Sequence, residues 1–428
     1  MSFQGNHDAE TLRLRANAEA LARLTNAEPV LVGVAPALEV VPGMSPELIL
    51  TSGAPLAWPE YSGGQRRALI YGALYEGLAR DPDEAADKLD RGVIRVATTQ
   101  EHGCIGSVAG IYTASMPVLI VEDRVHGNRA FCNLYEGASR YRLNYGSFDQ
   151  EVVDGLRWLE EVMAPVLSQS LSLQPVDLKP LMARALRMGD ELHSRNTAGT
   201  MLLTRELTPS LLRLAGDPAW AGRVQSVLEF LMANDYTFLR VGMAAAKATA
   251  DAAHGVPHSS VLTGMALNSR EFAIRVSGLE AEWFRGPHPS LDGKFFDGFT
   301  PEDAEWIGGE SCVTETVGLG AMTQACAPSL MEYQGGSFAT MLRNNESMYA
   351  ITLGEHPAYR IPALDFRGSP VGIDLHAVLS TGVTPLIDGG LAGKDGGQIG
   401  AGVLRPHLGA FQAAAAAYEL RYPQASGA

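Results

Sequence analysis

The chain has 428 residues, with 33 Lys and Arg against 48 Asp and Glu, so its formal net charge is −15. This length exceeds the roughly 250–300 residues at which a single hydrophobic core stops growing, so we expect two or three domains. An apolar content of 46% excludes a wholly disordered chain. The acidic balance argues against a nucleic-acid partner, because binding to a phosphate backbone requires clustered Lys and Arg.

The cysteines and the lack of long apolar runs indicate a compartment. The four cysteines form neither a CxxC pair nor a zinc-binding pattern, and they are too few for a disulfide scaffold. The start of the chain is polar and acidic and lacks the regions of a signal peptide, and the apolar run 117–121 has only the length of a buried strand. We therefore expect a cytoplasmic protein with reduced thiols and no membrane span.

Helical and strand-like patterns alternate in the first third of the chain. Residues 8–24 carry leucines at near-helical spacing, and residues 65–80 repeat apolar side chains with a helical period before the breaker pair Asp81-Pro82. Strands are predicted at 30–34 and 46–51, and buried strands at 93–98 and 118–122. This alternation predicts an α/β domain over residues 1–145.

The rest of the chain divides into a helical part and a second mixed part. Residues 149–253 show long helical patterns punctuated by proline, which predicts a helical domain over residues 146–255. Strand-like runs then return at 272–276, 313–317 and 349–353. The sequence ends in an Ala-rich helix and a tail, 423–428, that we expect to fray. The predicted class is mixed α/β (α+β), with two α/β domains, the second over residues 256–428, and a helical domain between or inserted.

The glycine-rich loop between the third and fourth predicted strands carries the first candidate site residue, His102. Its imidazole could serve as a general acid or donate a hydrogen bond to a polarised carbonyl. The alternative is a histidine that satisfies a loop carbonyl. Nothing near Cys104 in the sequence marks it as a thiolate, so we do not assign it as a nucleophile.

Polar residues follow the strand predicted at 118–122. Asn128 and Arg129 stand in a polar turn, and Asn133 and Glu136 come soon after. Polar turns at strand ends are typical of ligand sites in α/β folds. Because arginine forks onto a carboxylate and asparagine pairs with an amide, this run suits a carboxylate or amide substrate. The alternative is a surface turn with a helix cap.

The run MGDELHSRN places Asp190, His193 and Asn196 at i, i+3 spacing, beside Glu191 and Arg195. On a helix, this spacing would put acid, imidazole and amide on one face, where they could bind a metal or orient a catalytic histidine. The alternative is a solvated helix face. The HExxH pattern is absent, so a zinc hydrolase is not supported.

A further arginine lies on a predicted strand, two residues before Ser277. Arg275 alternates with Ile274 and Val276, so its side chain points to the opposite face of that strand. An inward-facing arginine would need an anion or a buried acid. The sequence alone favours the alternative, a solvent-facing arginine on a half-buried strand.

Glycines concentrate around the C-terminal motifs. Glu315 lies in the run TETVGLG, and Thr384, Lys394 and Gln398 lie in or beside a segment with seven glycines between 389 and 402. Backbone N–H groups in such a loop can cradle a phosphate, and Lys394 adds a positive charge. The alternative is a tight structural crossover. The P-loop, GxSxG and kinase patterns are all absent.

Taken together, these motifs resemble the YlbE-like family, whose members are encoded beside FdrA-type proteins in purine and ureide catabolism clusters. The resemblance extends from Pro55 to Pro406, and its motifs are GNRAFCN with YEG, MGDELHSRN, IRVSGL, TET with GLG, and TGVTPLIDGG with GQIGAG. It implies a mixed α/β fold with a helical part. It also implies a subunit of oxamate carbamoyltransferase, which carries out phosphorolysis of oxalurate to oxamate and carbamoyl phosphate.

The resemblance also implies site residues. The candidate catalytic residues are His102, Glu136, Asp190, His193 and Glu315. The candidate substrate-binding residues are Asn128, Arg129, Asn133, Arg195, Asn196, Arg275, Ser277, Thr384, Lys394 and Gln398. Two runs depart from the oxamate-type pattern, because EHGC stands in place of HHVN and NSRE in place of RNGN. Another N-carbamoyl acid or amide therefore stays open as the substrate.

Such a reaction needs an anion site, donors for the tetrahedral oxyanion and a proton donor for the leaving nitrogen. We expect Arg129 or Arg275 and the glycine-rich segment 389–402 to hold anions. We expect His102 or His193 to handle the carbonyl or the proton. No cofactor is assigned with certainty, and a divalent cation stays open.

The expected ligands are a small anionic ureide and phosphate or carbamoyl phosphate, with an FdrA-like protein as a candidate partner subunit. Apolar faces on the first and last predicted helices favour a homo-oligomer. Two alternatives remain for the function. The chain could be a non-catalytic or regulatory partner of an FdrA-like protein, or it could be an amidohydrolase that acts on a ureide.

Overall fold

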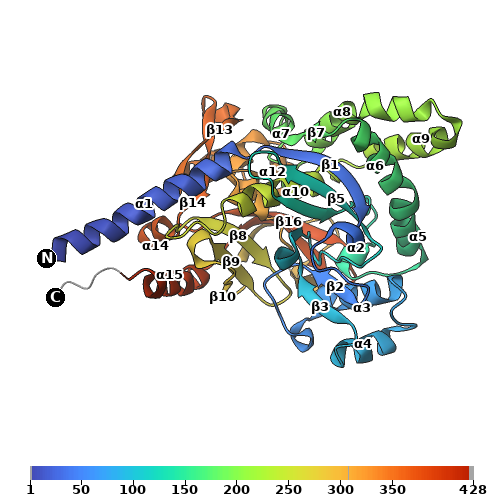
Figure 1. Ribbon diagram of the computed structural model, residues 1–428, viewed down its shortest axis with the longest axis horizontal. Coiled ribbons are helices and arrows are strands. Elements are labelled where there is room, and N and C mark those ends of the chain that lie inside the picture. The colour runs from blue at the N-terminus through green and yellow to red at the C-terminus, as the bar shows by residue number, and fades with distance from the viewer. Residues whose placement is uncertain (1, 307, 424–428) are drawn as a thin grey trace.

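A five-stranded sheet forms the scaffold of the first half of the molecule (Figure 1). In spatial order its strands are β4 (Cys104–Ile105), β6 (Arg129–Asn133), β5 (Pro117–Asp123), β1 (Pro29–Pro36) and β7 (Val176–Asp177). All neighbouring pairs are antiparallel except β4 with β6. A separate parallel pair consists of β2 (Leu48–Thr51) and β3 (Arg95–Thr98). The computed structural model describes residues 2–306 and 308–423.

Helix α10 (Thr237–Ala252) is buried along almost its whole length and packs on β1, β5 and β6. Its sequence is apolar or small on every side, which suits a helix enclosed by protein. Two cations interrupt this pattern, because Arg240 and Lys247 are both buried. Helix α10 therefore carries positive charge into the interior, and Arg240 lies in its first turn.

The second half of the molecule contains two further sheets and a hairpin. One sheet has the order β10 (Phe284–Gly286), β9 (Phe272–Val276) and β8 (Leu262–Leu267). The other has the order β11 (Ser290–Phe295), β16 (Gln398–Arg405), β15 (Ile387–Gly393) and β12 (Ala304–Trp306). The hairpin pairs β13 (Thr352–Ile361) with β14 (Arg367–Ile373). All of these pairs are antiparallel.

The remaining helices surround these sheets. In the first part of the chain they are α1 (Ser2–Asn26), α2 (Ala37–Val40), α3 (Gly63–Tyr75) and α4 (Pro82–Asp90). In the middle they are α5 (Gln150–Trp158), α6 (Ala164–Leu173), α7 (Leu178–Arg187), α8 (Thr197–Ala215) and α9 (Pro218–Ala233). Towards the end they are α11 (Val313–Thr316), α12 (Leu330–Gln334), α13 (Phe338–Met348), α14 (Leu375–Thr381) and α15 (Gly409–Arg421).

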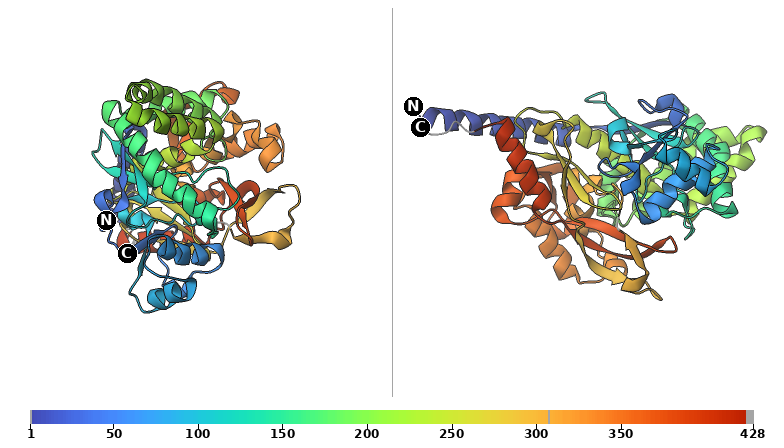
Figure 2. Two further views of the ribbon diagram at one scale, coloured as in Figure 1. Left: turned by 90° about the vertical axis from the view of Figure 1, so that its right-hand side faces the viewer. Right: turned by 90° about the horizontal axis from the view of Figure 1, so that it is seen from below.

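Helix α1 runs outward from the body of the molecule (Figures 1 and 2). Helices α8 and α9 pack against each other at the opposite end of the molecule (Figure 1). Of the described helices, none combines the length and the hydropathy that are needed to span a bilayer.

One hydrophobic core connects the three segments that the sequence suggests as domains. The largest core cluster includes Leu119, Leu207 and Val371, one from each segment, and a second cluster lies in the C-terminal segment. The α+β class predicted from the sequence is confirmed. The division at residues 145 and 255 stays a prediction.

Most of the predicted elements are present. The strands predicted at 30–34, 46–51, 93–98, 118–122 and 272–276 correspond to β1, β2, β3, β5 and β9. The first helix, the helical middle and the Ala-rich last helix are also present, although the short strand β7 interrupts the middle. The strand predicted at 349–353 begins only at Thr352, as β13. Most of the predicted tail, residues 424–428, lies outside the described residues.

Three predictions are wrong. Residues 313–317 form a helical turn, α11, because the hydroxyls of Thr314 and Thr316 bond to carbonyls three residues earlier and stabilise it. Residues 188–196 form a loop between α7 and α8 instead of a helix face. The glycine-rich segment 389–402 is mainly the hairpin β15–β16, where a Cβ at Gly402 would lie 2.4 Å from the Asp292 carbonyl oxygen.

Candidate functional site

A cavity of about 420 Å³ lies where the three segments of the chain meet. Its wall includes the loop after β6, the loop before α8, the first turn of α10 and the hairpin β15–β16. Binding sites for small molecules usually have volumes of roughly 300–1,000 Å³, so this cavity has room for a small ligand and a second small ion.

Three arginines line this cavity: Arg140, Arg142 and Arg240. Among the described residues, none of the three forms an ion pair with a carboxylate, whereas thirteen other arginines of the chain do. The Nε atoms of Arg142 and Arg240 are buried and have no acceptor among the described residues. A buried N–H donor without an acceptor is costly, so these two Nε atoms point to an anionic ligand.

The structure explains how Arg240 is held. The side chain is 4% exposed, and its Nη1 donates to Oδ1 of Asn133 at 3.0 Å. Asn133 is itself fixed at the end of β6, where its backbone N–H donates to the hydroxyl of Tyr112 at 2.9 Å. The predicted site residue Asn133 thus positions a cavity arginine.

Glu136 organises the loop that carries Arg140 and Arg142. Its carboxylate accepts the backbone N–H groups of Leu143, at 2.6 Å, and Asn144, at 3.2 Å. The amide of Asn144 also donates to Glu136 and accepts from the backbone N–H of Ile111. These bonds close the loop from 136 to 144, so Glu136 shapes the cavity wall and does not line the cavity.

A histidine–carboxylate pair lies at the same cavity. His193 lines the wall, and its Nδ1 lies 2.8 Å from Oε1 of the fully buried Glu315. The same oxygen accepts the backbone N–H groups of Ala321 and Asp388, each at 3.0 Å, and Oε2 accepts the hydroxyl of Thr314. Burial lowers the pKa of His193, but the charge of Glu315 and its hydrogen bond outweigh burial, so the pKa is raised. Because Glu315 holds Nδ1, the Nε2 atom is the one available to a ligand.

The loop 188–196 presents His193 and Ser194 to the cavity. Asp190 accepts the backbone N–H of Gly199 at 2.7 Å and lies 3.5 Å from the Arg195 Nε, so it anchors the start of α8. The amide of Asn196 donates to the carbonyl of His193 at 2.8 Å. Burial raises the pKa of Asp190 to about 6. Asp190, Arg195 and Asn196 therefore stabilise the loop and do not line the cavity.

Tyrosines form another part of the wall, at positions 135, 145, 236 and 333. The hydroxyl of Tyr333 accepts from Nε2 of Gln398 at 2.6 Å and hydrogen-bonds to Tyr236. Burial raises the pKa of both tyrosines, so both hydroxyls remain protonated donors. Gln398 is thus a predicted binding residue that does line the cavity.

The glycine-rich turn at Ser107 and Val108 closes the wall near Ser311. Val108 has a φ of 56°, which is strained for a β-branched residue. Gly309 packs against this turn, and a Cβ there would lie 2.3 Å from the backbone nitrogen of Val108. Such stored strain is typical of functional sites, because the surrounding structure must impose it.

Several predicted residues lie elsewhere. The Nδ1 of His102 contacts the carbonyl of Pro42 at 2.6 Å, the amide of Asn128 donates to a carbonyl of α10, and Arg129 pairs with Glu122. Arg275 is 8% exposed and pairs with the half-buried Asp251, so this arginine faces inward and meets an acid. These residues are not part of the cavity wall.

The remaining predicted residues are also outside the cavity wall. The hydroxyl of Ser277 donates to the carbonyl of Ala253 at 2.6 Å, and Lys394 donates to the carbonyl of Glu302 at 2.6 Å from an exposed turn. Thr384 lies in the loop between α14 and β15. Within the described part of the chain, no group of three or more His, Cys, Asp or Glu side chains is arranged to hold a metal ion. A divalent cation therefore stays a prediction.

Comparison with known proteins places this chain in a family. The family model described as oxamate carbamoyltransferase subunit AllG matches residues 94–311, which include all three cavity arginines and His193. The oxamate carbamoyltransferase subunit AllG of Escherichia coli K12 is 36% identical over 406 residues, covering 94% of this chain and 96% of that protein. The chain belongs to the AllG family.

Two other relatives extend the comparison without naming an activity. The uncharacterized protein YahG of Escherichia coli K12 is 40% identical over 410 residues, covering 95% of this chain and 86% of that protein. A crystal structure of a conserved protein of unknown function from Enterococcus faecalis V583 is 37% identical and has a TM-score of 0.92. It covers 96% of this chain and 98% of its own, so the AllG-family fold described above extends to that protein.

Sequence reasoning missed the three arginines, although two signals point to them. The run YEGASRYRLNY, residues 135–145, holds three tyrosines and two arginines without a helical or strand period. Arg240 stands in a helix of mostly apolar and small residues, where a cation is expected only with a partner or a ligand. The cavity of this AllG-family chain therefore combines anion-binding donors with a histidine whose pKa is raised by a buried carboxylate.

Proposed function

We propose that this chain is a subunit of a carbamoyltransferase that carries out phosphorolysis of an N-carbamoyl compound such as oxalurate. The observation that carries the proposal is the set of three arginines without carboxylate partners, in one cavity with the His193–Glu315 pair. Membership of the AllG family supports the carbamoyl chemistry. In this proposal the products are carbamoyl phosphate and the amide left after loss of the carbamoyl group, which is oxamate when the substrate is oxalurate.

The charges suit the two substrates. Oxalurate brings one carboxylate and phosphate brings one to two negative charges, and each suits the fork of a guanidinium. Arg140, Arg142 and Arg240 offer three positive groups to this cavity, and the raised pKa of His193 favours a fourth. An acidic protein can thus hold two anions, because the positive charges gather at one place.

The reaction proceeds in this proposal by addition and elimination. A phosphate oxygen attacks the carbamoyl carbon, and the carbonyl becomes a tetrahedral oxyanion that the arginines or the tyrosine hydroxyls stabilise. The bond from that carbon to the amide nitrogen then breaks, and the departing nitrogen takes a proton from Nε2 of His193. The raised pKa of His193 favours the imidazolium that this step needs.

The proposal is tested with the purified protein, oxalurate and inorganic phosphate, with carbamoyl phosphate as the measured product. The assay is repeated with an FdrA-like partner protein present. Carbamoyl phosphate that forms only with phosphate supports the proposal. Ammonia release in the absence of phosphate would identify an amidohydrolase instead. If activity needs the partner and survives His193→Asn in full, this chain is a non-catalytic subunit.

A further inference from the structure

Glu191 and Asp388 bring two more carboxyl groups to the His193–Glu315 pair. Glu191 precedes His193 by two residues, and the backbone N–H of Asp388 donates to Oε1 of Glu315 at 3.0 Å. Glu191 is 0% exposed and Asp388 is 1% exposed. Two acids buried this completely need donors or protons for every oxygen.

Glu191 shapes the loop that carries His193. Its Oε2 accepts the backbone N–H groups of His193, at 3.2 Å, and Arg195, at 3.0 Å. Its Oε1 accepts the backbone N–H of Ser194. One carboxyl group therefore gathers three consecutive amides, and the position of the loop follows the position of Glu191.

Asp388 lies on strand β15 and approaches the His193–Glu315 pair from that strand. Its Oδ1 accepts Nε2 of Gln334 at 2.8 Å, but its buried Oδ2 has no donor among the described residues. The N–H of Asp388 and the Nδ1 of His193 meet the same Oε1 of Glu315. Glu191 accepts the N–H of His193, so Asp388 and Glu191 belong to one cluster. Carboxylates only accept hydrogen bonds, so the buried Oδ2 of Asp388, which has no donor among the described residues, calls for a proton on one of the two acids.

The surroundings of Glu191 and Asp388 favour a proton on one of these two acids. Burial, followed by the charge of Glu315, raises the pKa of Asp388 to about 7, and burial with the charge of Asp388 raises the pKa of Glu191. The titratable groups that interact with the pair are His193, Glu315, Tyr236 and Cys326. Within the described residues, neither acid forms an ion pair with a lysine or arginine side chain, and the one cation, His193, is bonded to Glu315.

We propose that Glu191 and Asp388 are positioning residues that share one proton, and that this proton holds the loop 188–196 against strand β15. His193 and Ser194 are thereby kept at the cavity wall. Loss of the proton leaves two carboxylates beside Glu315, and their repulsion releases the loop. The effect of the shared proton on the loop is independent of the proposed function. The effect of this proton on ligand binding rests on that function.

The test is Asp388→Asn, followed by thermal unfolding between pH 4 and pH 9. The introduced amide keeps the oxygen that accepts from Gln334 and replaces the protonated oxygen by a donor to Glu191. In the wild type, the raised pKa of Asp388 stabilises the folded state fully at pH values below the ordinary aspartate pKa of about 3.9. That stabilisation is lost as the pH rises through about 7. The variant lacks this titration, so its melting temperature should rise by several degrees relative to the wild type between pH 4 and pH 7.

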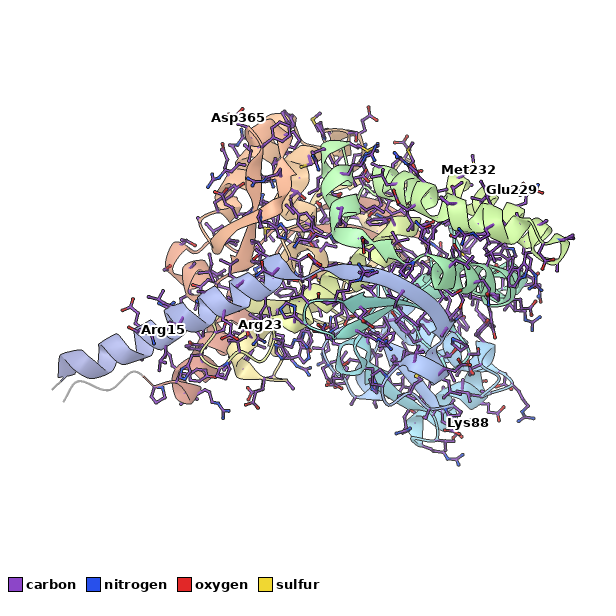
Figure 3. All side chains as sticks on the ribbon, turned by 45° about the horizontal axis from the view of Figure 1, so that its top comes forward. Arg15, Arg23, Lys88, Glu229, Met232 and Asp365 are labelled. Carbon is purple, nitrogen blue, oxygen red and sulfur yellow. The ribbon has the colours of Figure 1, made fainter. Side chains whose placement is uncertain are left out.

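The matched control is Asp365→Asn, at the exposed tip of the hairpin β13–β14 (Figure 3). This variant should follow the pH dependence of the wild type. The proposal is overturned if Asp388→Asn and the wild type lose stability in parallel across the same pH range.

A measurement on the wild type covers the case in which Asp388→Asn does not fold. Infrared difference spectra between pH 6 and pH 9 should show a protonated carboxylic acid that disappears as the pH rises. If the wild type has no such band at pH 6, the shared proton does not exist.

Titration calorimetry with inorganic phosphate separates this inference from the proposed function. The wild type should lose at least tenfold in phosphate affinity between pH 6 and pH 9, and Asp388→Asn should lose less. If phosphate fails to bind at any pH while the difference in stability is present, the proton pair stands and the proposed function falls. If wild type and variant lose affinity equally, the pair does not position His193.

Discussion

Nδ1 of His193 lies 2.8 Å from Oε1 of Glu315, although the two residues are separated by 122 positions in the chain. This contact joins the loop before α8 to the short helix α11 at the wall of the cavity. The same Oε1 accepts two backbone N–H groups, so the carboxylate is fixed before the imidazole bonds to it. His193 is therefore held in one orientation, with Nε2 available to a ligand.

His193→Asn should lower carbamoyl transfer at least tenfold. The side chain of asparagine can still donate to Glu315, so the fold should persist, but it cannot give a proton to the leaving nitrogen. Carbamoyl phosphate formation from oxalurate and phosphate measures the loss. The exposed residue His407 provides the control, and His407→Asn should keep full activity. Equal activity in both variants would remove His193 from the mechanism.

Glu315→Gln should lower the pKa of His193. Burial already opposes the imidazolium, and the charge of Glu315, its hydrogen bond and the charge of Glu191 together reverse that effect, with the Glu315 charge the largest of the three. With the charge removed, a titration of isotopically labelled histidine by NMR should show the imidazole losing its proton at lower pH. The raised pKa also stabilises the folded wild type below the ordinary histidine pKa of about 6.5, and this is lost as the pH rises through the folded value.

The control for this titration is Glu122→Gln, which removes an acid that pairs with Arg129 at the surface. It should leave the His193 signal where it is in the wild type. An unchanged His193 midpoint in Glu315→Gln would mean that the carboxylate does not set the protonation of this histidine.

Arg240→Gln should weaken phosphate binding by about 10- to 100-fold, because a hydrogen bond to a charged group contributes about 1.5–3 kcal/mol. Arg240 is the most buried of the three cavity arginines, and its Nε has no acceptor among the described residues. Titration calorimetry with inorganic phosphate measures the change. Arg343→Gln, an exposed arginine of α13, should bind phosphate like the wild type. Wild-type affinity in Arg240→Gln would place the anion elsewhere.

Gly309→Ala should destabilise the fold by more than Gly298→Ala. Both glycines have positive φ, 110° and 86°, so both variants carry backbone strain of about 1–2 kcal/mol. Only at Gly309 does the added Cβ also meet a backbone atom, the nitrogen of Val108 at 2.3 Å; nothing lies within 4 Å at Gly298. Urea unfolding should show the difference. Equal losses would mean that the turn at Val108 yields easily.

The periodic parts of the sequence predicted the fold well. The strand at 272–276 has the predicted bounds, because its apolar side chains leave a single pattern that fits a buried strand. The run 313–317 has the same β-branched character but forms α11, since its threonine hydroxyls find carbonyl partners within the turn. Local hydrogen bonds of this kind compete with the strand propensity of β-branched residues, and they leave no periodic pattern in the sequence.

The site was harder to predict, because its parts come together only in the folded chain. His193, Glu315 and Gln398 were named from motifs, and their closeness follows from tertiary packing. The predicted helix at 188–196 is absent because the carboxylate of Glu191 accepts three consecutive backbone N–H groups. In a helix these groups would donate to backbone carbonyls instead. Arg140 and Arg142 lie in an aperiodic loop, where the local density of tyrosine and arginine is a signal but no helical or strand period exists.

The most direct test of the central claim is a crystal structure of the protein with carbamoyl phosphate. We expect the phosphate group to contact at least two of Arg140, Arg142 and Arg240, with the carbamoyl group within hydrogen-bond reach of Nε2 of His193. A ligand bound at Arg129, at Arg275 or at the turn of the hairpin β15–β16, with this cavity unliganded, would contradict the account.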